Sequence, residues 1–567
     1  MGGPAPGPAC LAHAATDPRP LRAQRGAMEG LIQPYPLTLD KILKRARQVF
    51  PDKEVVSVLP SGKRHRYTYA DLYRRTVRLM NALRKLGVKQ GDRVATFMWN
   101  DYRHLELYYA IPSLGAITHT LNVRLFADQL TYIVNHAEDT LVFVDESLLE
   151  PLEAIAPELK TVRRYVIVSE GGHTPQTRLA PTADYETLLA EADDHEEFPA
   201  LDERLACAMC YTSGTTGSPK GALYSHRGLY LHTLMVGQVD AFGVGERDVI
   251  LPVVPMFHAN AWGAPFIAPM VGAKLVYAGQ NVAPEALVPL LREEGVTYAM
   301  GVPTIWQAML QYLRQAGGDL GAVTRMVVGG SSAPLAMIQA YKREFGVDIV
   351  HAWGMTEMSP LGTLTRPFSK MQDWSEERQW QALARVGRPV ACVELKIVDD
   401  AGGELPWDGE SAGELLVRGA AVASSYYQNP DAADRFEADG WFHTGDVATI
   451  DENGLLQITD RTKDLIKSGG EWISSVEMEN AIMACPGVAE AAVVARPDAR
   501  WDERPVAFVV RAGNGARLGA ADVIAHLAQD FAKWQLPAEE DIHFIAQIPR
   551  TSVGKFDKKV LRTQLEA

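Results

Sequence analysis

The segment Tyr211–Gly221, with the sequence YTSGTTGSPKG, holds the residues of this chain that are most suited to chemistry. The segment contains three glycines. Because glycine has no side chain, these residues let backbone N–H groups approach an anion closely. Hydroxyl donors and one positive charge accompany them. The residues concerned are Thr212, Ser213, Gly214, Thr215, Thr216, Gly217, Lys220 and Gly221. This mixture predicts a polyphosphate-binding loop, and the alternative is a flexible surface loop.

The order of these residues differs from that of the common nucleotide-binding loop. In that loop, G-x-x-x-x-G-K-[ST], the lysine lies between glycine and a serine or threonine. Here Lys220 lies between Pro219 and Gly221. A kinase or a simple ATPase with that loop is therefore disfavoured.

Five further segments combine glycine, aromatic and ionisable residues. They are Pro255–Gly263 (PMFHANAWG), His351–Pro360 (HAWGMTEMSP), His443–Val447 (HTGDV), Asp460–Ile473 (DRTKDLIKSGGEWI) and Pro549–Phe556 (PRTSVGKF). A lone carboxylate or lysine is most often a solvated surface charge. The order of the segments, rather than any single residue, makes them candidates for one site.

Alternating helical and strand-like segments must position these residues. Tyr69–Leu86 has apolar residues at helical spacing and is followed by Gly87, and Arg93–Met98 is typical of a buried strand. The alternation continues through strand-like segments at 140–144, 164–168 and 324–328. It predicts a large α/β domain made of two α/β subdomains with largely parallel sheets.

From Val393 the pattern changes to short strands separated by Gly and Asp turns, which predicts a small antiparallel, barrel-like β subdomain. A further unit begins near Asp460, with a helix at 475–484, paired strands at 489–495 and 506–510, and a helix at 520–533. We therefore expect a disordered tail at 1–36, an N-terminal domain at 37–459, and an α+β lid domain at 460–567 with a hinge near Asp460.

Size and composition narrow the class of protein. A chain of 567 residues exceeds one hydrophobic core, so two or more domains are expected. The net charge of −14 is spread along the chain and argues against nucleic acid as a main partner. Five scattered cysteines favour a reducing cytoplasm. The Cys207-x-x-Cys210 pair lies in an apolar run and favours a buried strand over a zinc site.

No segment has the length and composition of a membrane span. The most apolar stretch, Trp262–Val276, is too short and contains two prolines and a lysine. The first 27 residues lack the apolar region of a secretory signal, so we expect a disordered tail there, with a cleaved targeting peptide as the alternative.

Taken together and in this order, the loop and the five segments resemble the adenylate-forming superfamily. That superfamily includes acyl-CoA synthetases, firefly-type luciferases and the adenylation domains of peptide synthetases. The resemblance extends over 37–566. Within it, SGGEWISS and VVPMFHANAWG are most similar to medium- and long-chain fatty acyl-CoA synthetases and methylthioalkanoate CoA ligases.

The resemblance implies a reaction in two steps. ATP first converts a carboxylate into an acyl-adenylate with release of pyrophosphate, and CoA then displaces AMP to form the thioester. The first step needs polyphosphate binding, Mg²⁺ and a cation near the α-phosphate. ATP, Mg²⁺ and CoA are therefore the expected cofactors and co-substrates.

On the nucleotide side, the resemblance assigns a role to each motif. Glu357 resembles the Mg²⁺ ligand, a hard oxygen donor, and Thr212 a second contact to Mg²⁺ or phosphate. Thr356 resembles the residue that binds the α-phosphate. Asp446 resembles the ribose-binding carboxylate, assisted by Arg461. The expected adenine pocket, in which Trp353 offers a stacking face, comprises Gly330, Ser331, Ser332, His351, Ala352, Trp353 and Gly354.

The resemblance also implies a moving lid. Lys555 resembles the catalytic lysine that neutralises charge developing during adenylation, and a surface lysine is the alternative. Family behaviour implies that the lid rotates about Asp460 after adenylation, which withdraws Lys555. The rotation brings up the face Lys467–Trp472, which includes Gly469 and Gly470 and helps to form the CoA tunnel. Lys463 and Lys467 are candidates to contact the nucleotide or its phosphates.

On the acyl side, His258 and Trp262 are four residues apart, which is one turn if the segment is helical. In the fatty acyl branch, Trp262 resembles a gate over the acyl tunnel, and His258 a residue that steers the carboxylate or helps to admit CoA. A tryptophan packed in a core is the alternative. Gly301 and Gly329 are small wall positions, and the absence of an evident charge among the wall positions favours an apolar acyl tail.

The sequence thus predicts a fatty acid–CoA ligase for a medium- or long-chain carboxylate. A ligase for a short methylthioalkanoate or an aryl-alkanoate is the main alternative, since pocket depth alone separates them. A carrier-loading adenylating enzyme is disfavoured, whereas a luciferase-like oxygenase shares the motifs and is left open as a second activity. The expected location is the cytoplasm, while homodimer formation and peripheral membrane contact are left open.

Overall fold

The computed structural model describes residues 30–171, 175–212, 218–461, 464–468, 471–498, 500–513, 518–551 and 556–566. Residues 30–36 belong to a separate unit from 37–567 and contain no helix or strand. The rest of the predicted tail lies outside the described residues. Within the described ranges, no helix is long and apolar enough to cross a bilayer.

The first subdomain is built on a seven-stranded sheet that is parallel except at β9. Its order is β7 (Thr182–Asp184), β6 (Arg164–Val168), β5 (Leu141–Asp145), β3 (Arg93–Phe97), β4 (Ile117–Thr120), β8 (Ala206–Tyr211) and β9 (Gly221–Ser225). Cys207 and Cys210 are buried in β8, as the predicted strand requires.

Helices cover both faces of this sheet. Successive residues of a strand point to opposite faces, so neighbours in one strand pack against different helices. Val94 of β3 packs with α2 (Tyr69–Lys85), α3 (Tyr102–Ser113) and α6 (Tyr185–Glu191). Its neighbour Ala95 packs with α4 (Ala127–Ala137) and α5 (Leu149–Ile155). Strands buried on both faces explain the continuous apolar runs in this part of the sequence.

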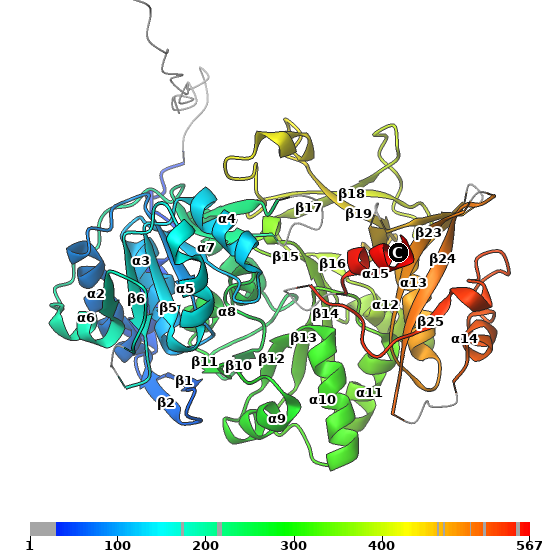
Figure 1. The fold of residues 1–567 in the computed structure, drawn as a ribbon, viewed down its shortest axis with the longest axis horizontal. Coiled ribbons are helices and arrows are strands. Elements are labelled where there is room, and N and C mark those ends of the chain that lie inside the picture. The colour runs from blue at the N-terminus through cyan, green and yellow to red at the C-terminus, as the bar shows by residue number, and fades with distance from the viewer. Residues whose placement is uncertain are drawn as a thin grey trace, which may run out of the picture. The chain divides into compact units, whose positions relative to one another are not determined.

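The second subdomain is built on a nine-stranded sheet (Figure 1). Its order is β16 (Arg388–Pro389), β15 (Leu361–Leu364), β14 (Asp348–Gly354), β13 (Arg325–Val328), β12 (Tyr298–Gly301), β10 (Val249–Pro252), β11 (Lys274–Tyr277), β1 (Glu54–Val58) and β2 (Arg64–Thr68). The strands from β14 to β1 are parallel. The two subdomains confirm the predicted α/β class.

The sequence order did not indicate that β1 and β2 join this second sheet. Glu294, whose side chain is 1% exposed, helps to hold them there. Arg64 and Arg66 of β2 and Lys274 of β11 all pair with its carboxylate. Three cations around one buried carboxylate offset the cost of removing its charge from water.

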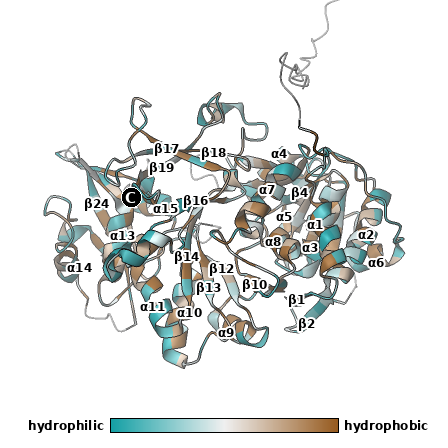
Figure 2. Cartoon of the chain, turned by 180° about the vertical axis from the view of Figure 1, so that it is seen from behind, coloured by the Kyte–Doolittle hydropathy of each residue, from teal (hydrophilic) through white to brown (hydrophobic). Residues whose placement is uncertain are grey.

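The helices of the second subdomain are α1 (Asp40–Val49), α7 (His226–Val236), α8 (Ala264–Val271), α9 (Pro284–Glu293), α10 (Pro303–Ala316), α11 (Leu335–Phe345) and α12 (Glu376–Ala384). Helix α8 is hydrophobic along its length (Figure 2), and every residue in it but the last is buried. The stretch Trp262–Val276, the most apolar of the sequence, therefore consists of a helix buried in the core and the residues on either side of it.

The predicted β subdomain is a four-stranded antiparallel meander: β17 (Val393–Val398), β18 (Gly413–Gly419), β19 (Phe442–Ile450) and β20 (Leu456–Arg461). Asp460, near the expected hinge, lies inside β20 and is buried. One oxygen of its carboxylate accepts a hydrogen bond from the backbone N–H of Ser475 at 2.6 Å. Rotation of the lid near this residue stays a prediction.

The C-terminal unit is the expected α+β structure. Its sheet contains β22 (Glu471–Ile473), β21 (Ile466–Ser468), β24 (Asp502–Arg511), β23 (Val488–Asp498) and β25 (Ile542–Phe544). Its helices are α13 (Ser475–Ala484), α14 (Ala520–Leu527) and α15 (Lys558–Glu566). The helix expected at 520–533 ends at Leu527, and the backbone N–H groups of Gln529 and Asp530 then donate to carbonyl oxygens three residues back.

Candidate active site

Most of the described site candidates lie near the same edge of the nine-stranded sheet. Strands β10, β12, β13 and β14 are neighbours and parallel, so their carboxyl ends meet at that edge (Figure 1). Pro255–Gly263 follows β10, Gly301 ends β12, Gly329 and Gly330 follow β13, and Trp353 and Gly354 end β14. Crevices at the carboxyl ends of parallel strands are the usual ligand sites of α/β folds.

On the nucleotide side, Asp446 is the centre of a small polar cluster. The pairing of β19 with β20 sets Asp446 directly opposite Arg461, and Nε of Arg461 lies 3.0 Å from Oδ1 of Asp446. The indole N–H of Trp353 donates to Oδ2 at 2.9 Å. Asp446 is 2% exposed, so its charge acts strongly on its partner and raises the pKa of Arg461.

This cluster brings together three residues that the sequence placed around one nucleoside. Both oxygens of Asp446 are already engaged, so a ribose bound there would share or replace the contacts from Trp353 and Arg461. The hydrogen bond from Trp353 to Asp446 was not predicted; the sequence proposed only that the indole offers a stacking face. The ribose and adenine roles stay predictions.

His351 connects the end of β14 with its surroundings. Its Nδ1 lies 2.7 Å from the carbonyl oxygen of Ala384, which only accepts, so Nδ1 carries the proton. Nε2 then accepts the backbone N–H of Ala333 at 3.3 Å. Burial lowers the pKa of His351 to about 4 and keeps it neutral. The ring therefore fixes the loop after Gly330 and Ser331 to β14 and α12.

The phosphate side is described at both ends of the glycine-rich loop. The backbone N–H of Thr212 donates to the carbonyl oxygen of Lys220 at 2.9 Å, which closes the loop at its base. The hydroxyl of Thr212 accepts the backbone N–H of Lys220 at 3.4 Å. The predicted phosphate contacts Ser213, Gly214, Thr215, Thr216 and Gly217 lie outside the described residues.

Glu357 is held beside this loop by residues that sequence reasoning missed. Tyr426 donates its hydroxyl to Oε1 of Glu357 at 2.5 Å, and Nζ of Lys220 lies 5.2 Å from the centre of the Tyr426 ring. The hydroxyl of Tyr224 donates to the carbonyl of Thr356 at 2.7 Å. Burial and the adjacent Glu357 raise the pKa of Tyr426. No motif includes Tyr224 or Tyr426, so the sequence carried no signal for them.

The residues around Glu357 fit the way proteins bind Mg²⁺ together with a nucleotide. Mg²⁺ is usually held by one or two carboxylates and by substrate phosphates rather than by an all-protein cage. Glu357 is 5% exposed, and its partner Tyr426 also contacts Lys220 at the base of the predicted phosphate loop. Among the described residues, no group of three or more His, Cys, Asp or Glu side chains is arranged to hold a metal.

The segment where an acyl tail is predicted to bind contains a short turn, Ala259–Gly263, which we call the acyl-side turn. Its residues have positive φ angles of 43° at Ala259, 55° at Asn260, 47° at Ala261 and 53° at Trp262. A left-handed backbone costs non-glycine residues about 1–2 kcal/mol each. The spacing of His258 and Trp262 along a right-handed helical turn therefore does not apply.

Trp262 and Gly329 are nevertheless brought together. Trp262 is 8% exposed, and a Cβ atom at position 329 would lie 3.3 Å from its Cη2. His258 precedes the turn and is half-buried. A Cβ atom at Gly301 would lie 2.8 Å from Cζ2 of Trp306, so this glycine makes room for a core residue. The substrate roles of these four residues stay predictions.

The lid contributes few described site residues. Lys555, Lys463, Gly469 and Gly470 lie outside the described residues, and the backbone alone of Trp472 is described, in β22. Lys467 is exposed on β21, and its backbone N–H donates to Glu503 at 2.8 Å. The catalytic and CoA roles of the lid therefore stay predictions.

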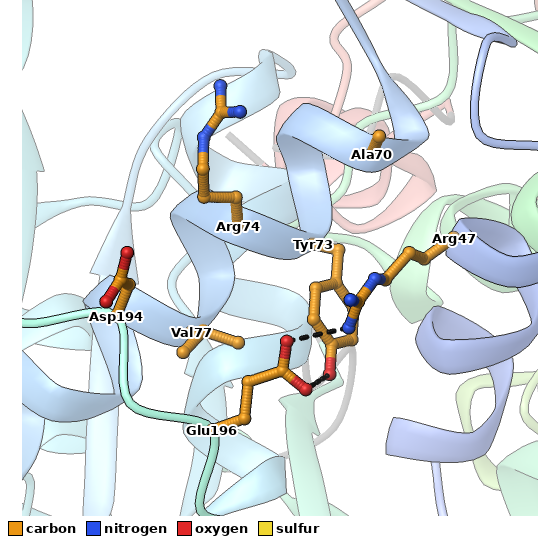
Figure 3. A pocket seen from close by; sticks show the side chains of 7 residues that line it. All are labelled: Arg47, Ala70, Tyr73, Arg74, Val77, Asp194 and Glu196. Carbon is orange, nitrogen blue, oxygen red and sulfur yellow. Dashed lines mark hydrogen bonds and ion pairs between the residues drawn. The ribbon is translucent and has the colours of Figure 1, made fainter.

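A cavity of about 290 Å³ lies elsewhere, beside α1 and α2 (Figure 3). Arg47 and Tyr73 both contact Glu196, at 2.7 Å and 2.8 Å (Figure 3). None of the predicted site residues lines this cavity. Because no predicted site residue lines this cavity and Arg47 already pairs with Glu196, we place the candidate active site at the carboxyl edge of the nine-stranded sheet.

The fold around this edge is that of adenylate-forming enzymes. The AMP-binding enzyme family model matches residues 43–427, and the model of the AMP-binding enzyme C-terminal domain matches residues 477–555. The chain belongs to the AMP-binding enzyme family.

Similar proteins narrow the class further. The long-chain-fatty-acid–CoA ligase of Thermus thermophilus is 47% identical over 530 residues, which cover 93% of this chain and 95% of that protein. The 3-methylmercaptopropionyl-CoA ligase of Ruegeria lacuscaerulensis is 43% identical over 95% of this chain and 99% of its own length. A crystal structure of an anthranilate CoA ligase with anthranoyl-AMP has a TM-score of 0.83 and 25% identity, covering 94% of this chain and 98% of that one.

The predicted superfamily, the fold class and the AMP-forming acid–thiol ligase class are thereby confirmed. Enzymes of this class act on a carboxylate, ATP and CoA.

Proposed function

We propose that this chain is a fatty acid–CoA ligase that activates a medium- or long-chain carboxylate. The proposal rests on one observation: a polar surface and an apolar surface lie at the same edge of the nine-stranded sheet. One is the polar cluster of Asp446, Arg461 and Trp353. The other is the apolar acyl-side turn with Trp262 against Gly329. A nucleotide on the first surface and an acyl tail on the second would place a carboxylate next to an α-phosphate.

The nucleotide-side residues would bind and orient ATP. Asp446 is suited to the ribose hydroxyls because its carboxylate is fixed in orientation by two donors. Thr356 would bind the α-phosphate, and Thr212 and Lys220 the outer phosphates. Glu357, with Thr212 as a second contact, would hold Mg²⁺, which when bound offsets the negative charge of the phosphates.

Lys555 would complete the first half-reaction. A carboxylate is a poor acyl donor, and its attack on the α-phosphate builds negative charge that an adjacent ammonium stabilises. The acyl-adenylate then carries AMP as a leaving group for the thiolate of CoA. We infer that movement of the lid exchanges Lys555 for a CoA-binding face that includes Lys467 and Trp472.

The acyl tail would lie toward Trp262, as a gate, with His258 near the reacting carboxylate. The similarity to the fatty-acid–CoA ligase of Thermus thermophilus supports a medium or long tail. The similarity to the 3-methylmercaptopropionyl-CoA ligase supports a short methylthioalkanoate as the second candidate. The two candidates differ in the depth of the apolar pocket beyond Trp262.

We also infer a cytoplasmic location, supported by the few and scattered cysteines. A homodimer is the assembly to test. Light scattering during size-exclusion chromatography distinguishes a mass near 62.2 kDa for one chain from twice that mass.

The function is tested by measuring pyrophosphate release with ATP, Mg²⁺ and a panel of acids. The panel runs from propionate to palmitate and includes aryl and methylthio acids. We expect the highest kcat/KM with a medium- or long-chain acid and conversion to the acyl-CoA when CoA is added. A preference for methylthio acids would select the second candidate. If no acid supports pyrophosphate release, the proposal is wrong.

A further inference from the structure

The flank of the acyl-side turn that follows β10 is held by a residue of the other subdomain. Asn100, which follows β3, donates its amide N–H groups to the carbonyl oxygens of Pro252 at 3.3 Å and Val254 at 3.0 Å. Its Oδ1 accepts the backbone N–H of Met256 at 2.6 Å. Asn100 is 7% exposed. One side chain thus binds three peptide groups in the segment that leads into the turn.

Two tyrosines of α3 hold both flanks of the turn. The hydroxyl of Tyr108 donates to the carbonyl oxygen of Met256 at 2.5 Å, and that of Tyr109 donates to the carbonyl oxygen of Pro265 at 2.8 Å. Both side chains are buried, and burial raises the pKa of each hydroxyl, which therefore stays protonated and able to donate. Asn100, Tyr108 and Tyr109 bracket the turn from a neighbouring subdomain.

The turn needs such support because its own residues disfavour its backbone. Ala259, Ala261 and Trp262 have left-handed φ angles without being glycine, although Asn260 and Gly263 suit that region better. If the flanking segments could move, the turn would relax to commoner angles and the indole of Trp262 would leave Gly329. Strained segments persist where the surrounding structure fixes both of their ends.

We propose that Asn100, Tyr108 and Tyr109 form a clamp whose members are positioning residues for acyl binding. The clamp fixes the acyl-side turn and so keeps Trp262 against Gly329. The part of this proposal that concerns acyl binding rests on the proposed function, in which Trp262 borders the acyl site. None of the three residues belongs to a motif, and none would touch the substrate.

Tyr109→Phe tests the clamp, since it removes one hydroxyl and leaves the ring in place. Tyr341→Phe is the matched control, because Tyr341 is also buried and donates to the backbone carbonyl of Trp306 at 2.7 Å. Steady-state kinetics are measured for each acid of the panel and for ATP. For Tyr109→Phe we expect the KM for the preferred acid to rise roughly tenfold and the chain-length profile to change, while the KM for ATP changes by less than about twofold.

Tyr341→Phe should leave both KM values and the profile as in the wild type. An unchanged KM for acid and an unchanged profile in Tyr109→Phe would contradict the clamp, as would an equal effect of the control. Asn100→Ala should act in the same direction as Tyr109→Phe. Asn100→Ala removes three hydrogen bonds and can fail to fold. The clamp is therefore tested by comparing Tyr109→Phe with Tyr341→Phe.

Ala261→Gly gives a second, independent measurement. Glycine suits a φ of 47° at this position, so this change should stabilise the turn, whereas Ala268→Gly in the regular helix α8 should destabilise it. Added to Tyr109→Phe, Ala261→Gly should restore much of the lost affinity for the acid. A double variant with a KM no lower than that of Tyr109→Phe alone would overturn the proposal.

A readout without catalysis separates the clamp from the proposed function. The chain has 11 tryptophans, so the signal of Trp262 is taken as the difference between each protein and the same protein carrying Trp262→Phe. Acrylamide should quench this difference signal more strongly in Tyr109→Phe than in the wild type or Tyr341→Phe. Equal quenching would contradict the clamp even if no acid were a substrate, and a fully active wild type would leave the proposed function intact.

Discussion

The nucleotide side and the acyl side of the site are held in place by different physical means. On the nucleotide side, charged and aromatic side chains contact one another, as Asp446 contacts Arg461 and Trp353. On the acyl side, the backbone itself has an uncommon conformation, and its flanking peptide groups are bound from another subdomain. Polar side-chain pairs are specified by residue type, whereas the acyl-side turn depends on its surroundings.

This difference suggests why one side suits a fixed ligand and the other a variable one. A nucleotide is the same in every turnover, so a rigid, buried carboxylate is an advantage. Acyl tails differ in length and shape, and the acyl-side turn offers them the apolar side chain of Trp262 rather than a charged partner. Substitutions on the two sides should therefore have separable effects on ATP and on acid.

The largest effect is expected where the two sides meet, at the scissile α-phosphate. Lys555→Ala should reduce the rate of adenylation by about 100-fold or more, because it removes the cation that stabilises the developing charge. Conversion of supplied acyl-AMP and CoA to acyl-CoA should be spared. Lys559→Ala, an exposed lysine of α15, is the control and should affect neither step. Equal loss in both half-reactions would contradict a lid that uses two positions.

The next largest effect should come from the nucleotide side. Asp446→Asn should raise the KM for ATP by roughly 30-fold or more, since it removes a buried charge and leaves Arg461 without its ion pair. The preference among acids should not change. Asp451→Asn breaks a comparable pair, to Arg385 at 2.9 Å, and serves as the control. A shift in chain-length preference with Asp446→Asn would show that the two sides are not separable.

The acyl side should give a smaller and more selective effect. Trp262→Ala should change kcat/KM for the acids by about tenfold, in a manner that depends on chain length, with little change in the KM for ATP. Trp306→Ala is a control for the loss of a buried tryptophan, since Trp306 packs at Gly301. If Trp262→Ala lowers stability as Trp306→Ala does but leaves the acid profile unchanged, Trp262 is a packing residue only.

The smallest effect concerns pH, and it compares one buried histidine from each side. Burial lowers the pKa of His232, which packs by Gly263, to about 3, and that of His351 to about 4. Unfolded histidine has a pKa of about 6.5, so below that pH the unfolded chain binds protons that the folded chain does not. As the pH falls from 6.5 to 4, each histidine should therefore lower the free energy of unfolding by up to about 1.4 kcal/mol per pH unit.

Urea unfolding of His232→Gln and His351→Gln at pH 5, 6 and 7 measures these contributions. Each variant should show a flatter pH dependence than the wild type, and the difference from wild type is the quantity to compare. Glu106 acts in the opposite direction in all three proteins, because burial raises its pKa to about 7. A variant with the same slope as the wild type would show that its histidine is not a buried neutral group.

The sequence predicted most of the fold because its elements follow local patterns. The alternation of helices and buried strands gave both α/β subdomains, and the helix at Ser475–Ala484 has the predicted bounds. The placement of β1 beside β11 could not be predicted in this way. This placement depends on pairing between distant segments and on the buried Glu294. Glutamate is usually exposed, so the sequence does not indicate this role.

The candidate site was predictable where a residue belongs to a motif. Asp446 and Arg461 lie in two motifs, and the register of β19 with β20 brings them together. Tyr426 and Asn100 belong to no motif and reach the site only through tertiary contacts. The spacing of His258 and Trp262 suggested a right-handed helical turn, but the structure has a left-handed turn there. The contacts that support this turn come from outside the segment, so its own sequence does not reveal them.

The central claim is that an acid is adenylated before CoA takes part. Isotope exchange between pyrophosphate and ATP measures that step directly in the presence of acid and in the absence of CoA. The account predicts rapid exchange that depends on a medium- or long-chain acid, with formation of acyl-AMP. Exchange that requires CoA, or that no acid supports, would contradict it.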